Sequence, residues 1–188
     1  PLVEHVSLRV PRGMEEGQAT LELVVGGATI PLGSIQILTG NHIFTAPSVP
    51  NEVHAMLPGV GHLVGFHQTP EDTLRLGQPL TLTLIWQAIS DSDIQDLTVF
   101  THLVDRSGGI IAQHDGKPGN GVRPTPSWLE GEFVTDVHIL QWVDDYQGPA
   151  VLRVGMYDAK TGQRYRWADG SDYLDLPGEI RVISETED

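Results

Sequence analysis

The chain has 188 residues, of which 39% are hydrophobic, and its 25 acidic and 11 basic residues give a net charge of −14. This hydrophobic content is enough for a packed core, and the negative charge repels phosphate backbones, so nucleic acid is not an expected partner. Because the sequence contains no cysteine, disulfides, thiol nucleophiles and Cys-based zinc sites are excluded.

The predicted elements are almost all β-strands, because apolar residues recur at every second position between turns rich in glycine and proline. The clearest run is Leu80–Trp86, in which leucine and tryptophan alternate with threonine and isoleucine. In chain order, the expected strands are Val6–Val10, Ala19–Val25, Ser34–Leu38, Leu63–Phe66, Leu80–Gln87, Leu97–Val104, Ile110–His114, Phe133–Val143, Ala150–Tyr157 and Glu179–Ile183. Short strands at this spacing predict an antiparallel β-sandwich, immunoglobulin-like or jelly-roll-like.

Two pairs of segments in the chain resemble each other and occur in the same order. Gly17–Val24 is similar to Gly148–Gly155, and Pro31–Ile37 is similar to Leu176–Val182. One interpretation is that residues 1–45 are the closing strands of a preceding β unit. Residues 46–58 would then form a Pro-rich linker or an edge crossing, and residues 59–188 a complete sandwich. The alternative is that two β-rich stretches look alike through composition alone.

The order of several sequence blocks resembles a known family. The blocks are Leu82–Ala88, Thr98–Asp105, Ala112–Gly116, Pro124–Thr125 with Trp128, Gly131–Glu132 with Asp136, and Gly155–Asp158 with Thr161–Gly162. They resemble the soluble C-terminal β-sandwich domains of bacterial multi-span membrane glycosyltransferases of the mannosyl- and aminoarabinose-transferring type. The resemblance covers residues 55–183. It implies an extracytoplasmic, non-enzymatic appendage tethered to the membrane through a parent membrane-protein domain, and it assigns no catalytic residue.

The start and hydropathy of the chain agree with a fragment of a longer protein. The sequence begins at Pro1, lacks a signal-peptide pattern and contains no apolar run of 18 residues, so we do not expect this fragment to insert directly into a membrane.

Carboxylates are the first candidates for chemistry. Asp105, Asp115, Asp136, Asp158 and Glu132 would have to converge in pairs to hydrolyse a glycoside, which requires an acid together with a base or nucleophile. Asp105 and Asp158 each lie in a glycine-containing turn, where aspartate commonly accepts hydrogen bonds from turn amides. A glycan-processing enzyme is therefore a minor alternative.

Metal sites are the next possibility. His62 with His67, or His102 with His114 and Asp115, offer imidazole and carboxylate ligands. His102 shares one strand face with Phe100 and Val104, so a buried, hydrogen-bonded histidine is the simpler interpretation. No cofactor is expected apart from a possible structural calcium ion. The acidic loop offers oxygen ligands for calcium at Asp91, Asp93 and Asp96. The simpler interpretation of this loop is a solvated acidic turn.

Sugar binding is the strongest specific alternative, because β-sandwich modules stack sugar rings on exposed aromatic side chains beside polar groups. The candidate glycan-binding residues are Trp128, Asp115, Asp136 and Trp142, with Tyr146, Tyr165 and Trp167 as further aromatics. The competing interpretation makes Trp128 a packing anchor at the end of the sandwich. We therefore expect a binding or positioning domain, with a carbohydrate-binding module of a secreted or cell-surface protein as the alternative.

Overall fold

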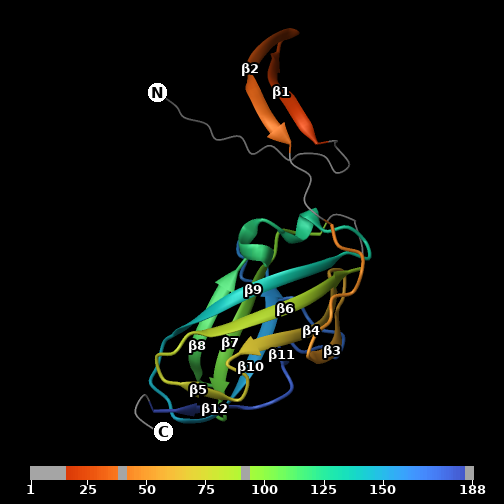
Figure 1. The fold of residues 1–188 in the computed structure, drawn as a ribbon. Coiled ribbons are helices and arrows are strands. Elements are labelled where there is room, and N and C mark those ends of the chain that lie inside the picture. The colour runs from red at the N-terminus through yellow and green to blue at the C-terminus, as the bar shows by residue number, and fades with distance from the viewer. Residues whose placement is uncertain (1–15, 38–41, 90–93, 185–188) are drawn as a thin grey trace. The chain divides into compact units, whose positions relative to one another are not determined.

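The computed structural model describes residues 16–37, 42–89 and 94–184, and the chain forms two compact units, residues 1–41 and 42–188. Nearly all of the described elements are strands (Figure 1), which confirms the predicted all-β class. Among the described residues, no helix is long and apolar enough to cross a membrane.

The first unit contains an antiparallel hairpin of β1 (Gly17–Val25) and β2 (Ala28–Ile37). Its turn uses Gly26 and Gly27 at φ values of 58° and 85°, a conformation that glycine adopts without steric cost. The hairpin includes the predicted strands at 19–25 and most of 34–38, although β2 starts six residues earlier than expected. The predicted strand Val6–Val10 lies outside the described residues.

The second unit contains a ten-stranded sheet and two short 3-10 segments. Its elements are β3 (Asn51–Leu57), β4 (Gly61–Thr69), β5 (Thr73–Arg75), β6 (Leu80–Ala88), β7 (Thr98–Asp105), β8 (Ile110–Gly116), η1 (Pro118–Gly121), η2 (Thr125–Ser127), β9 (Phe133–Trp142), β10 (Gly148–Tyr157), β11 (Leu174–Asp175) and β12 (Ile180–Ile183). The strand order is β3-β4-β6-β9-β8-β7-β10-β12-β5, with β11 paired to β10. All of these pairs are antiparallel except β5 with β12, so the sheet is mixed.

The ten-stranded sheet curls into two facing layers. β8 and β9 pair only through Ala112 with Trp142 and Gln113 with Gln141, and at this point the sheet turns. In Figure 1, β4, β6 and β9 cross in front of β7, β8 and β10. Buried residues from both layers form one hydrophobic core.

β6 shows why the sequence forms this sandwich. Leu82, Leu84 and Trp86 are fully buried while Thr81 and Thr83 on the opposite face are only half-buried, as the two-residue alternation predicts. The Trp86 ring stacks on Trp167 at a centroid distance of 6.1 Å and an interplanar angle of 20°. These large aromatic side chains fill the space between the two layers.

The predicted linker at 46–58 and the predicted boundary at residue 45 differ from the structure. The second unit begins at residue 42, and β3 occupies Asn51–Leu57 as an edge strand of the large sheet. Its side chains Val53 and Ala55 pack against the core. Prolines at 50 and 58 flank the strand, which is compatible with an edge because proline lacks the N–H of a central strand. The edge-crossing alternative therefore describes this segment better than a linker.

Candidate functional site

β9 places two polar side chains among its core-facing residues. Val134, Asp136, His138 and Leu140 are all at most 2% exposed, as expected for alternate residues of one strand face. Asp136 pairs with the buried Leu84 of β6 across the ladder, which confirms that it points inward. A buried polar group is costly unless it is hydrogen-bonded, so its partners determine what this site can do.

A continuous line of hydrogen bonds satisfies these groups. The Gly119 backbone N–H donates to Oδ1 of Asp136 at 2.9 Å, and Nε2 of His138 lies 2.8 Å from Oδ2. Nδ1 of His138 is 2.8 Å from Nδ1 of His114, which projects from β8. We call Asp136, His138 and His114 the buried relay. It brings together two strands and η1 at one end of the sandwich.

The buried relay can hold only one proton between its two imidazoles. Two nitrogen atoms 2.8 Å apart share a single hydrogen, because protonating both would replace the bond with a repulsion. Burial lowers the pKa of His114, and the neighbouring His138 lowers it further. The relay therefore orients His114 and keeps it neutral near pH 7.

A second polar cluster lies on the opposite face of β8, next to the buried relay in sequence. The Tyr157 hydroxyl donates to Asp115 at 2.9 Å, and Nε2 of His102 is 3.8 Å from the other oxygen of that carboxylate. Burial lowers the pKa of His102 and raises the pKa of Tyr157. We call Asp115, Tyr157 and His102 the outer cluster. The Asp115 side chain is 41% exposed, so its carboxylate is accessible to solvent, whereas His102 is buried.

Phe100 packs beside the outer cluster because β10 has no side chain at position 155. A Cβ at Gly155 would lie 2.3 Å from Cζ of Phe100, well inside van der Waals contact. The Phe100 ring is 5.0 Å from the ring of His102, and the Arg164 guanidinium carbon lies 4.5 Å above it. Arg164 in turn pairs with Asp172, so the chain between β10 and β11 covers this ring.

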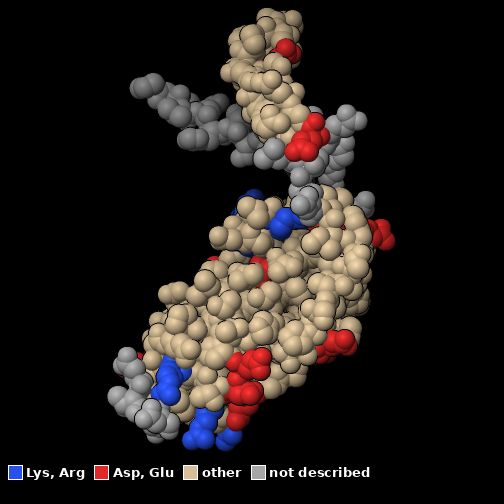
Figure 2. Space-filling model, in the orientation of Figure 1, with Lys and Arg blue, Asp and Glu red and all other residues tan. Residues whose placement is uncertain are grey.

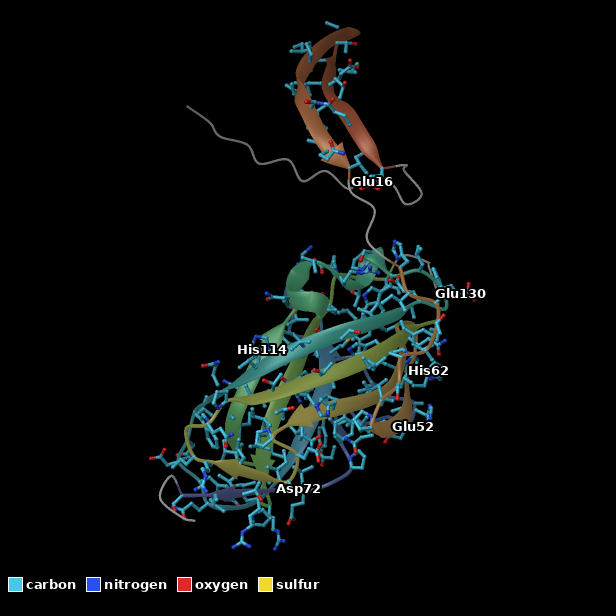
Figure 3. All side chains as sticks on the ribbon, viewed as in Figure 1. Glu16, Glu52, His62, Asp72, His114 and Glu130 are labelled. Atoms are coloured by element: carbon cyan, nitrogen blue, oxygen red, sulfur yellow. The ribbon has the colours of Figure 1, made fainter. Side chains whose placement is uncertain are left out.

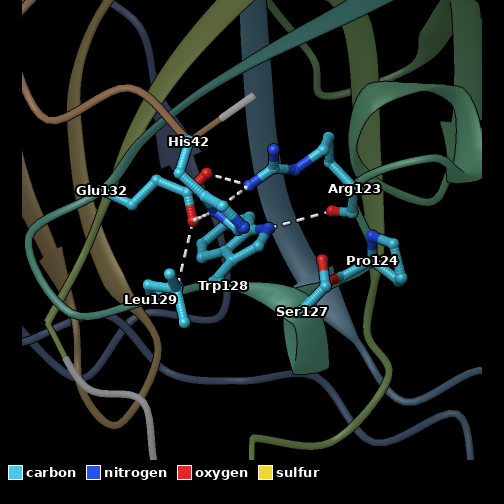
Figure 4. Close-up of polar contacts among 7 residues, drawn as sticks. All are labelled: His42, Arg123, Pro124, Ser127, Trp128, Leu129 and Glu132. Carbon is cyan, nitrogen blue, oxygen red and sulfur yellow. Dashed lines mark hydrogen bonds and ion pairs between the residues drawn. The ribbon is translucent and has the colours of Figure 1, made fainter. Parts of the chain in front are cut away.

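Glu132 is the centre of a third polar cluster, near η2 (Figure 4). The carboxylate is 1% exposed, pairs with Arg123, and lies 3.0 Å from Nδ1 of His42. It also accepts the backbone N–H of Leu129 at 3.0 Å. Burial lowers the pKa of His42, with a smaller effect from Arg123. This cluster attaches residue 42 to the loop before β9.

The structure corrects the glycan-platform hypothesis for Trp128. The residue is 0% exposed, and its Nε1 donates to the Arg123 carbonyl at 2.9 Å (Figure 4). A sugar ring stacks only on an exposed aromatic face, and this indole has none. It lies instead 6.3 Å from the ring of Trp86, as the packing-anchor interpretation requires. Asp136 is corrected for the same reason, because it is 0% exposed and cannot meet a glycan.

The other candidate aromatic residues also make internal contacts. Trp142 donates to the Gln78 carbonyl at 2.8 Å, and Tyr146 donates to the Pro149 carbonyl at 2.9 Å. Trp167 is 3% exposed, and Tyr165 packs against the core. Of the predicted glycan-binding residues, Asp115 keeps the most accessible polar group, whereas Trp142 is partly covered.

The turn aspartates have the role expected from their positions. Asp105 accepts the N–H of Ser107 and of Gly109, each at 2.8 Å, and the Ser107 hydroxyl at 2.7 Å. These bonds, with the Ser107 side chain contributing most, lower the pKa of Asp105. Asp158 likewise accepts the Lys160 N–H at 2.8 Å, and that bond lowers its pKa. Each of the five carboxylates considered for hydrolysis is thus held by its own set of partners.

The metal hypotheses find no support in the described part of the chain. There, no group of three or more His, Asp or Glu side chains is placed to hold an ion. His62 pairs with Gln87 and His67 with Thr83, so the first two candidates lie four residues apart along β6. Of the second group, His114 and Asp115 are consecutive on β8 and point to opposite faces, and Figure 3 shows His114 well away from His62. Asp96 pairs with Lys117. Asp91 and Asp93 of the calcium hypothesis lie outside the described residues.

The comparisons with known proteins leave the family open. No protein-family model matches the chain, and no curated protein matches its sequence.

Proposed function

We propose that the chain is a non-catalytic, extracytoplasmic accessory domain of a larger, membrane-anchored protein of the glycosyltransferase type. Its role in this proposal is to bind and position the parent membrane-protein domain. The supporting observation is an uncharged surface on one side of the sandwich.

This surface is the outer side of β4, β6 and β9, which we call the outer face. Cross-strand neighbours share a face, so the ladders place Ile139, Thr81 and Thr69 in one row and Val137, Thr83 and His67 in the next. On these three strands, the outer face consists of His62, Gly65, His67, Thr69, Thr81, Thr83, Ile85, Gln87, Phe133, Thr135, Val137 and Ile139, of which Gly65 and Ile85 are buried. The outer face includes no Asp, Glu, Lys or Arg, and Glu52 of the neighbouring edge strand β3 lies opposite Gly65 at its border.

The absence of charge from the outer face is unusual in a chain whose net charge is −14. In Figure 2, the broad surface over β6 and β9 is almost entirely tan, and acidic side chains gather toward its edges. Val137 and Ile139 are 47% and 50% exposed on it. The centres of protein interfaces are depleted of charged residues in this way, which supports a protein partner here.

The internal contacts of the candidate carboxylates support a non-catalytic role. Asp105 and Asp158 hold turns, Glu132 is enclosed by Arg123 and His42, and Asp136 ends the buried relay. A glycosidase requires two carboxylates on either side of one bond. The four side chains are instead held by hydrogen bonds and ion pairs within the fold, which supports a structural role for them.

The experiment is site-specific photo-cross-linking in the parent protein. A benzophenone amino acid at position 137, on the outer face, is expected to cross-link to the membrane-spanning part of the same protein. The matched control is position 122, where Val122 is 78% exposed outside the outer face. Equal cross-linking from both positions, or none from position 137, would contradict the proposal.

Glycan binding is the second candidate function, and the outer cluster is the observation that favours it. Asp115 and Tyr157 place a carboxylate and a hydroxyl side by side at a solvent-accessible position, and sugars are bound through such groups. A glycan titration followed by calorimetry tests this role. Asp115→Asn would abolish binding, whereas Asp145→Asn, at an exposed position elsewhere, would not. Absence of binding in the unchanged chain would exclude it for the glycans tested.

A further inference from the structure

The hairpin β1–β2 repeats the pairing of β10 and β12 residue by residue. In the hairpin, Gly17 faces Ile37 and Ala19 faces Ile35. In the large sheet, Gly148 faces Val182 and Ala150 faces Ile180. The same correspondence follows from the two sequence similarities. Aligning Gly17–Val24 with Gly148–Gly155 matches Gly17 to Gly148, and aligning Pro31–Ile37 with Leu176–Val182 matches Ile37 to Val182. Two stretches that were alike through composition alone would not be expected to pair in the same register.

The two strand pairs also place their apolar and polar residues on matching faces. In β10, Ala150, Leu152 and Val154 are buried and face the core. The equivalent residues of β1 are Ala19, Leu21 and Leu23, which alternate with Gln18, Thr20 and Glu22. The hairpin β1–β2 is therefore amphipathic with the same phase as β10. Its apolar face corresponds to the surface that β10 presents to the core of the sandwich.

The two strand pairs differ in their neighbouring strands. β10 pairs on its other side with β7, and β12 pairs on its other side with β5. Among the described residues, the sheet of the first unit contains only β1 and β2, and Leu23, Val25 and Leu32 are 46%, 58% and 61% exposed. A two-stranded hairpin is marginally stable alone, and a free edge with an apolar face favours pairing with further strands.

We propose that β1–β2 is the closing hairpin of a second sandwich of the same type, whose other strands precede it in the parent protein. A strand equivalent to β7 would pair antiparallel with β1, and a strand equivalent to β5 would pair parallel with β2. The protein is then a tandem of at least two sandwiches. This proposal does not depend on the proposed function of the second unit.

The first test compares amide hydrogen exchange at residues 17–37 in this chain and in the parent protein. An isolated hairpin opens readily, so fast exchange is expected in this chain, whereas pairing on both edges should slow exchange in the parent by about 100-fold or more. Equal exchange in the two proteins, whether fast or slow, would overturn the proposal. So would an upstream sequence without strands.

The second test uses a pair of substitutions in the parent protein. Leu21→Asp places a charge at the position equivalent to buried Leu152, and Thr20→Asp places the same charge on the polar face. We expect Leu21→Asp to lower the thermal midpoint of the preceding sandwich and to abolish the slow exchange of β2. Thr20→Asp should leave both unchanged. Equal effects of the two substitutions would show that the apolar face is not covered and would overturn the proposal.

Discussion

Nδ1 of His114 on β8 and Nδ1 of His138 on β9 lie 2.8 Å apart, although 24 residues separate them in the chain. The contact joins the two layers of the sandwich close to the turn between them, because β8 and β9 pair through only two residues each. Beyond His138, the buried relay ends on Asp136 and on the backbone of η1. The hydrogen bonds at this end of the sandwich therefore link residues of β8, β9 and η1.

The first prediction is that the protein loses stability in mild acid. Burial is the largest cause that lowers the pKa of His114, His102 and His42 below the ordinary histidine value of about 6.5. Below that value the unfolded chain binds more protons than the folded one, so the free energy of unfolding falls as pH decreases. Urea unfolding at pH values from about 8 to 5 measures the slope. A free energy of unfolding that stays constant or rises toward pH 5 would contradict the prediction.

A substitution separates the contribution of His114 from that of the other two histidines. His114→Gln removes one titrating group while retaining a side chain that can hydrogen-bond to His138, so the dependence of stability on pH between 8 and 5 should become shallower. NMR titration of the His114 ring should give a pKa below the ordinary histidine value of about 6.5. A variant with the same slope as the unchanged protein would show that the buried relay does not carry the effect.

The second prediction concerns the buried carboxylate of Asp136. Replacing Asp136 with alanine leaves the Gly119 N–H and Nε2 of His138 without their acceptor, and each buried group left without a hydrogen-bond partner costs about 1–3 kcal/mol. Thr135→Ala, at an exposed position of the same strand, is the control and should change stability by less than about 1 kcal/mol. Denaturant unfolding compares the two, and similar losses would argue against a buried role for Asp136.

The third prediction concerns the close approach of Gly155 and Phe100. Gly155→Ala places a methyl group 2.3 Å from Cζ and 2.5 Å from Cε1 of Phe100, and overpacking of this kind costs about 1–3 kcal/mol. The loss should be smaller when Phe100 is already replaced by leucine. A double-mutant cycle measures this coupling. If Gly155→Ala were equally harmful in both backgrounds, the clash would not be with the Phe100 ring.

The fourth prediction concerns Thr125 at the start of η2. Its hydroxyl accepts the Leu97 N–H at 3.0 Å and donates to the Gln95 carbonyl at 2.5 Å, and the residue is 0% exposed. Thr125→Val keeps the shape but leaves the buried Leu97 N–H unsatisfied and removes the donor to the part-buried Gln95 carbonyl, which costs about 1–3 kcal/mol. Thr135→Val, at an exposed position, is the matched control. Thermal unfolding should separate the two variants, and indistinguishable midpoints would contradict the prediction.

The sequence by itself located most strands, because a strand with one buried face carries its own two-residue pattern. Leu80–Ala88 and Phe133–Trp142 agree with the predicted strands to within one residue at each end. The similarity between Gly17–Val24 and Gly148–Gly155 also lies in the sequence, and the structure adds the shared register. Short strands such as β5 and β11 escaped prediction because two or three residues carry no periodicity.

Only the tertiary structure determined which polar groups form hydrogen bonds with one another. The alternation of β9 places Asp136 and His138 on the same face as Val134, yet nothing local to that strand indicates that His114 and Gly119 would reach them. Trp128 likewise has neighbours that only folding supplies, because Trp86 lies on a strand 42 residues earlier in the chain. Periodicity is a property of neighbouring residues and can be read from them. Burial and hydrogen bonding across a β-sandwich depend on strand order and register, which are set by contacts between distant segments.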